Sequence, residues 1–140
     1  MQIDKVFLER LLAEAEKSER RRVNFDLRNS AEDTSQRMLN ALLPDTEVPI
    51  HRHVDTAETV FCLQGRLEEV FYEEVETYTQ ESSLQQGDVL RQRSFREIAR
   101  YVLCPKDGLH GMQIPIGTWH TVHVIEPSVI FEAKDGKYKG

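Results

Sequence analysis

The sequence has few cysteines, no long apolar run and no excess of basic residues. Its 140 residues include 2 cysteines, Cys62 and Cys104, which are too few for a secreted disulfide framework and do not form a CxxC pair. No run approaches the roughly 18 apolar residues of a membrane-spanning helix, and the first residues do not resemble a secretory signal. Basic residues number 18 against 24 acidic ones, so neither a nucleic acid nor an anionic membrane is an expected partner. We therefore expect a cytoplasmic protein whose cysteines are reduced.

The composition that remains is that of one folded domain. Hydrophobic residues make up 39% of the chain and charged residues 30%. A chain of this length can bury roughly 68–70% of the surface that its unfolded form exposes, so its core needs neither a disulfide nor a structural metal.

Residues 1–45 are predicted to form a helical segment that packs on the rest of the domain. Between residues 4 and 21 apolar side chains recur on one stripe of a helix, and Asp4 can cap its start. A second helix is expected over residues 34–43, ended by Pro44.

From residue 46 to residue 140 the pattern is typical of an all-β barrel. Alternating or apolar segments are separated by glycine, proline and aspartate. Turns are expected at Gln64-Gly65, Gly87-Asp88 and Asp107-Gly108. The candidate strands, with one short strand before the second helix, are 24–28, 47–54, 57–64, 66–75, 88–93, 96–104, 111–114, 118–126 and 128–133.

Two runs of charge lie in the predicted strands. The acidic run is Glu68, Glu69, Glu73, Glu74 and Glu76, and the basic run is Arg91, Arg93, Arg96 and Arg100. The arginines have the geometry for a phosphate, but pairing of Glu with Arg across neighbouring strands on a solvated face explains both runs. We adopt the second interpretation.

The segment from Pro49 to Val60 contains a set of residues suited to a transition metal. On a strand, His51 and His53 point to the same side, and Glu58 follows at the start of the next strand. Two imidazoles and a carboxylate suit Fe, Mn, Ni, Co or Zn and leave positions open for a ligand.

A second block supplies a fourth candidate ligand, His120. It follows Pro115 and Gly117, which are expected to turn the chain into a strand. His123 lies at an odd offset from His120 and so faces the other side of a regular strand. We therefore predict a site made of His51, His53, Glu58 and His120, and we exclude His123.

The two blocks together resemble the conserved boxes of the cupin superfamily, small β-barrels that hold a metal through three histidines and a glutamate. More narrowly, residues 38–46, 49–53, 111–122 and 127–136 resemble the WbuC-type cupin-fold metalloproteins. The resemblance implies a mainly β, jelly-roll barrel of the double-stranded β-helix type, preceded by N-terminal helices. It also implies one divalent transition-metal ion (Fe, Zn, Mn, Ni or Co).

The WbuC-type resemblance implies a small polar ligand, such as a carbohydrate or nucleotide-sugar intermediate of surface-polysaccharide metabolism. Three activities stay open: a metal-dependent isomerase or epimerase, an Fe(II)-dependent dioxygenase, and a non-catalytic binding or sensing protein. The expected contacts with a substrate inside the barrel are Gln64, Tyr72, Arg100 and Gln113. The amphipathic first helix and the open edge of the barrel favour a homodimer.

Overall fold

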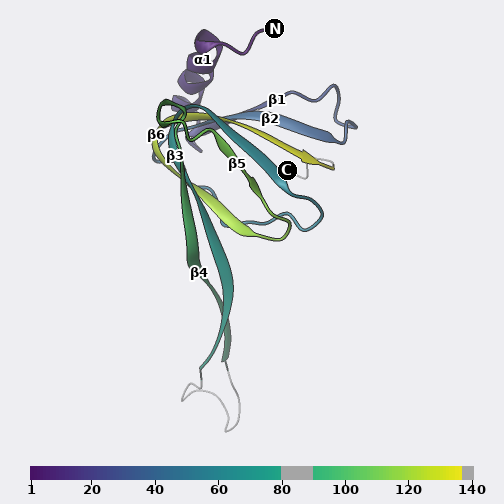
Figure 1. Cartoon of the computed structure of the whole chain (residues 1–140), viewed down its shortest axis with the longest axis vertical. Helices are drawn as coiled ribbons and strands as arrows, with labels where there is room; N and C mark the ends of the chain where they lie inside the picture. The colour runs from purple at the N-terminus through teal and green to yellow at the C-terminus, as the bar shows by residue number, and fades with distance from the viewer. Residues whose placement is uncertain (80–89, 137–140) are drawn as a thin grey trace.

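One α-helix, one short 3₁₀ helix and six antiparallel strands form the part of the chain that the structure describes, residues 1–79 and 90–136 of a computed structural model (Figure 1). The strands of the sheet lie in the order β1-β2-β6-β3-β4, and β5 pairs with β3. The predicted mainly β class is confirmed. The elements are α1 (Lys5–Glu16), β1 (Arg22–Asp26), β2 (Ser35–Leu42), β3 (Glu58–Thr79), β4 (Leu90–Leu103), η1 (Pro105–Asp107), β5 (Gly111–Ile114) and β6 (Trp119–Asp135).

The first helix forms where the sequence predicts it, although it ends earlier, at Glu16. Asp4 caps it by accepting a hydrogen bond from the backbone N–H of Phe7 at 2.9 Å. The buried stripe of α1 packs on one face of β2 and β6, forming a core cluster with Leu39, Ala41 and Val129. Of the described residues, none belongs to a helix long and apolar enough to cross a membrane.

The second predicted helix, over residues 34–43, is wrong. This segment is β2, which pairs with β1 on one side and β6 on the other. The apolar residues have helical spacing by coincidence, because the strand is buried on both faces: Leu39 and Ala41 face α1, whereas Met38 and Leu42 face the opposite side. Two strands within the first 45 residues therefore belong to the same sheet as β3–β6.

Several predicted strands are joined into longer ones. Segment 66–75 and all but the first residue of segment 57–64 lie within β3, and the expected turn at Gln64-Gly65 is instead a region of register shifts inside that strand. Gly65 has φ +99°, and a Cβ there would lie 2.3 Å from the carbonyl oxygen of Pro127. Only glycine allows β3 to bulge this close to β6.

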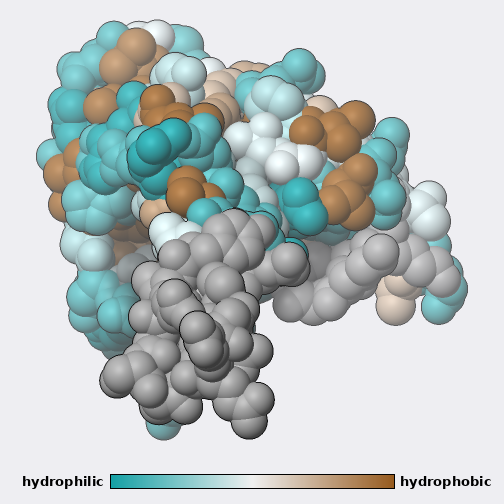
Figure 2. All heavy atoms as spheres, turned by 90° about the horizontal axis from the view of Figure 1, so that it is seen from below, coloured by the Kyte–Doolittle hydropathy of each residue, from teal (hydrophilic) through white to brown (hydrophobic). Residues whose placement is uncertain are grey.

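The described parts of β3 and β4 also form a long hairpin that extends away from the rest of the sheet (Figure 1). All but the last residue of segment 96–104 lies within β4, and segments 118–126 and 128–133 are joined in β6, which begins at Trp119. The turn at Asp107-Gly108 is observed, with φ +75° at Gly108. The expected turn at Gly87-Asp88 lies outside the described residues. The face of the molecule seen along the hairpin is largely hydrophilic, with hydrophobic residues in small groups (Figure 2).

Candidate metal centre

The four predicted metal ligands come together from three separate segments of the chain. Glu58 is the first residue of β3 and His120 the second residue of β6. His51 and His53 lie in the segment that joins β2 to β3. The strand predicted over 47–54 does not form, because this segment makes only one isolated bridge, between the backbones of His51 and His120. That bridge brings His51 beside His120, with N···O distances of 3.0 and 2.8 Å.

The side chains of the cluster lie at metal-ligand spacing. One ligand atom from each of the four residues can be chosen so that all lie within 4.8 Å of one another. Oε2 of Glu58 is 2.8 Å from Nε2 of His53 and 3.7 Å from Nε2 of His120. Ligand bonds of about 2.0–2.2 Å to a first-row ion leave neighbouring ligand atoms about 3–3.5 Å apart. The arrangement therefore suits a divalent metal ion.

Backbone carbonyls orient two of the imidazole rings. Nδ1 of His51 lies 2.8 Å from the carbonyl oxygen of Pro49, and Nδ1 of His120 lies 2.9 Å from that of Thr118. A carbonyl oxygen only accepts hydrogen bonds, so Nδ1 of each ring carries the hydrogen. The Nε2 lone pair of each ring is then available to a metal ion, as in most metal-binding histidines.

The electrostatics of the cluster favour the protonation states that bind a metal. Burial alone would raise the pKa of Glu58, but the neighbouring imidazoles of His120 and His53 outweigh burial and lower that pKa to about 2. Burial also lowers the pKa of His51. At neutral pH Glu58 is thus ionised and His51 neutral, which are the forms that coordinate a metal.

The cluster lies in the wall of a cavity of about 500 Å³ between the strands. The same cavity holds two carboxyl side chains that the sequence analysis did not propose for the site, Glu69 on β3 and Glu132 on β6. Two amides of β2, Gln36 and Asn40, also line it. The cavity therefore combines the candidate metal ligands with a second group of polar side chains.

The two additional carboxyl groups are held far from their ordinary titration range. Burial raises the pKa of Glu69 well above its usual value, and the charges of Glu132 and Glu58 act in the same direction. Burial and the charge of Glu58 raise the pKa of Glu132 to about 8, against a hydrogen bond with Asn40 that lowers it. Such shifts are typical of functional cavities, although structural networks also produce them.

The expected substrate contacts do not line this cavity. Arg100 is exposed and forms ion pairs with Glu97 and Glu68, at 2.5 and 3.1 Å. Together with Tyr72 it lines a second hollow, beside His123. Gln113 is exposed on β5, with Nε2 3.4 Å from Oγ1 of Thr59.

Gln64 is also absent from the lining of the cavity. Regular alternation from Glu58 would turn it inward, but the register shifts on either side of Gln64 change which residues of β3 face inward. Its expected place inside the barrel, like those of Tyr72, Arg100 and Gln113, is therefore not observed.

The remaining histidine and cysteine predictions agree with the structure. His123 points away from the cluster and lies with Nδ1 2.8 Å from a carboxylate oxygen of Glu68. Cys62 and Cys104 are both free and buried. Burial raises the pKa of Cys62 to about 11, so its thiol stays protonated and unreactive at neutral pH.

Comparison with known proteins finds one matching family model and several solved structures of similar fold. The model of a family described as "Domain of unknown function (DUF6016)" matches residues 3–84. A search of curated proteins finds no match to the chain.

Solved structures resemble the chain at low sequence identity. E. coli ycfD is 18% identical with a TM-score of 0.51, and the match covers 74% of this chain and 26% of that one. The capsular polysaccharide assembling protein CapF from Staphylococcus aureus is 16% identical with a TM-score of 0.50, over 76% of this chain and 24% of that one. Oxalate oxidase in complex with the substrate analogue glycolate is 14% identical with a TM-score of 0.53, over 88% and 55%.

These likenesses show that the chain has the cupin fold, as the sequence predicts. The chain spans about a quarter of the length of the first two proteins and about half of the third. At these identities the likeness concerns the fold alone.

Proposed function

We propose that this chain, which belongs to the DUF6016 family and has the cupin fold, uses one divalent transition-metal ion to bind and act on a small polar molecule. The observation that carries the proposal is the position of the four candidate ligands. They converge within 4.8 Å in the wall of a cavity large enough for a small molecule. A divalent ion bound there would supply Lewis-acid chemistry toward a carbonyl or hydroxyl oxygen.

The finer part of the proposal is a carbohydrate or nucleotide-sugar ligand of surface-polysaccharide metabolism. Its support is the sequence resemblance to WbuC-type proteins and the polarity of the cavity. Amide and carboxyl groups line its interior, and the basic residues Arg20, Arg22 and Lys134 also line it, where a phosphate could be bound. CapF, a capsular polysaccharide assembling protein, shares the fold, which makes such a ligand compatible with this architecture.

Two carboxyl groups of the cavity that are not metal ligands favour catalysis over binding without turnover. An isomerase or epimerase must move protons, and Glu58 cannot do so freely while it coordinates an ion. Glu69 and Glu132 offer carboxyl groups in the same cavity with raised pKa values, as proton transfer near neutral pH requires. A non-catalytic sensor and an Fe(II)-dependent dioxygenase are the alternatives. We also propose that the protein is cytoplasmic and forms a homodimer.

The metal content of freshly purified protein tests the proposal. We expect about one equivalent of a transition metal per chain in the wild type and a loss of most of it in His53→Ala. His123→Ala is the matched control, since it removes an exposed histidine from β6 without touching the cluster. Elemental analysis measures all three proteins, and a wild type without stoichiometric metal, or equal content in His53→Ala, would contradict the proposal. Iron would favour oxygen chemistry, and zinc or nickel an isomerase or a binding protein.

A further inference from the structure

Two deeply buried side-chain oxygens in the cavity have no hydrogen-bond partner among the described residues: Oε1 of Gln36 and Oε2 of Glu69. Gln36 is 5% exposed and Glu69 is 2% exposed. Buried polar atoms in native proteins are nearly always paired, and each unpaired one calls for an explanation. Because both side chains line the same cavity, a molecule bound there would supply the missing partners.

The metal cluster does not account for these two oxygens. Neither residue belongs to the group of four whose ligand atoms lie within 4.8 Å of one another, although Glu69 pairs with Val122, two residues from His120. The neighbouring polar groups, Asn40 and Glu132, are already hydrogen-bonded to each other. Among the described residues, Gln36 and Glu69 are therefore the deeply buried groups of the cavity that still have an unpaired oxygen.

The chemistry of the two oxygens selects hydrogen-bond donors. The amide oxygen of Gln36 accepts hydrogen bonds, whereas the carboxyl group of Glu69, whose pKa burial raises, can both accept and donate them. A small carboxylate ligand offers no donor and would leave Oε1 of Gln36 unpaired. A cationic ligand would supply donors, but four basic residues line the same cavity and would repel it, as would a bound divalent ion: Arg20, Arg22, Arg52 and Lys134. Hydroxyl groups supply donors without charge.

We infer that Gln36 and Glu69 form a recognition site for hydroxyl groups, so that the ligand of the cavity is a polyhydroxylated molecule held by hydroxyls at this site. The inference rests on the proposed function, because it assigns contacts of the same ligand that the metal ion does not make. Oε1 of Gln36 accepts a hydrogen bond from one ligand hydroxyl, and the carboxyl group of Glu69 is hydrogen-bonded to another. They thereby determine specificity for sugars and polyols over carboxylates and amines.

A binding experiment tests the site directly. Metal-loaded protein is titrated with D-glucose, D-galactose, D-mannose and D-mannitol, and with glycolate and putrescine as anionic and cationic probes, and chemical shifts are followed by NMR. We expect at least one of the four polyols to bind and Glu69→Leu or Gln36→Leu to weaken that binding about ten- to a hundredfold. Glu69→Gln keeps one acceptor oxygen and should lose less. Glu68→Gln, on the opposite face of the same strand, should bind as the wild type does.

The thermal stability of the same variants separates recognition from a structural role. If Glu69 is present for a ligand, its unpaired carboxyl group destabilises the ligand-free protein, and Glu69→Leu should raise Tm by about 2–6 °C. A structural role predicts a lower Tm instead. Binding of putrescine or glycolate alone, no binding of any polyol, or equal polyol affinity in Glu69→Leu, Gln36→Leu and wild type would overturn the inference. Metal analysis of each sample distinguishes these results from failure of the proposed function, which would appear as a wild type without metal.

Discussion

Two adjacent glutamates of β3 have opposite surroundings. Glu68 accepts hydrogen bonds at 2.8 Å from His123 and 3.1 Å from Arg100, and these partners lower its pKa. Glu69 faces the cavity, is buried, and has an oxygen without a partner, so its pKa is raised. One residue type on one strand is thus stabilised as an anion on the outer face and destabilised as an anion on the inner face.

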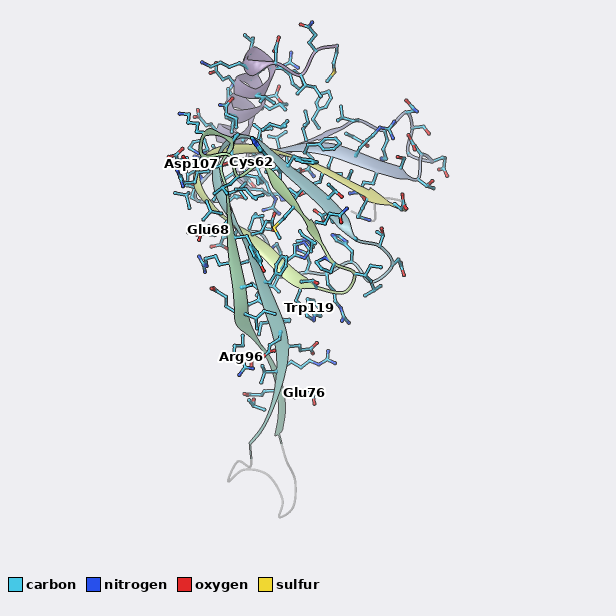
Figure 3. All side chains as sticks on the ribbon, in the orientation of Figure 1. Cys62, Glu68, Glu76, Arg96, Asp107 and Trp119 are labelled. Atoms are coloured by element: carbon cyan, nitrogen blue, oxygen red, sulfur yellow. The ribbon has the colours of Figure 1, made fainter. Side chains whose placement is uncertain are left out.

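The same difference separates Glu73 and Glu74 of the acidic run from the carboxyl groups that line the cavity. On the hairpin of β3 and β4, Glu73 pairs with Arg96 and Glu74 with Arg93, and Figure 3 shows Arg96 along this projecting part of the sheet. In the cavity, Glu58 is held by histidines alone, whereas Glu69 and Glu132 resist ionisation. The outer carboxylates form ion pairs with arginines of the same chain. The inner carboxyl groups are therefore those available to an ion or a ligand.

Among the variants that distinguish the inner from the outer face of β3, we expect Glu58→Gln to have the largest effect, on the affinity for a metal ion. This change keeps the shape of the side chain but removes the anionic ligand, which is ionised at neutral pH because the pKa of Glu58 is about 2. We expect the affinity for Zn²⁺ to fall at least about a hundredfold, measured by competition with a chelating indicator at pH 7. Glu68→Gln on the outer face should keep the wild-type affinity. Equal affinities in the two variants would remove Glu58 from the metal site.

A smaller effect is expected from Glu132 on the pH dependence of stability. In the folded protein its pKa is about 8, and in the unfolded chain it is near the ordinary value of 4.5. Between these values the folded state binds more protons than the unfolded state, so stability falls as pH rises from about 4.5 to about 8. The contribution is at most about 1.4 kcal/mol per pH unit.

Thermal unfolding of chelator-treated protein between pH 5 and pH 8.5 measures this contribution. Glu132→Gln should flatten the decline of Tm with pH, because the neutral amide does not titrate. Glu126→Gln, an exposed residue of the same strand, should leave the slope of the wild type unchanged. A Glu132→Gln slope equal to that of wild type would show that Glu132 titrates normally in the folded protein.

The metal cluster can be predicted from the sequence because its geometry is mostly local. Three of its residues lie within residues 51–58, and the fourth follows a turn that Pro115 and Gly117 define. His51 and His53 are predicted to point to one side through a strand over 47–54, and that strand does not form. Even without that strand, one backbone bridge to His120 aligns His51 with the site.

The inner carboxyl groups cannot be predicted in the same way, because their direction depends on the bulges of β3. Glu58 and Val60 face inward on even positions, whereas Leu67 and Glu69 face inward on odd ones. The register shifts between Cys62 and Leu67 cause this change, and they depend on the close approach of Gly65 to β6. From the sequence alone Glu69 belongs to a run of surface charge. β2 is predicted as a helix for a related reason. Both faces of this strand are buried, so its sequence lacks the alternation of polar and apolar residues that indicates a strand.

The smallest effect is expected on the outer face, where charge removal should change little. Arg93 lies 2.9 Å from Glu74, but its side chain is 72% exposed, and exposed ion pairs contribute little because solvent and salt screen them. We expect Glu74→Gln to shift Tm by less than about 2 °C, and the shift to vanish at 0.5 M NaCl. Differential scanning calorimetry at low and high salt measures both. A loss as large as the change caused by Glu69→Leu would mean that the outer carboxylates also hold the fold together, and that the two faces of β3 differ in solvation but not in role.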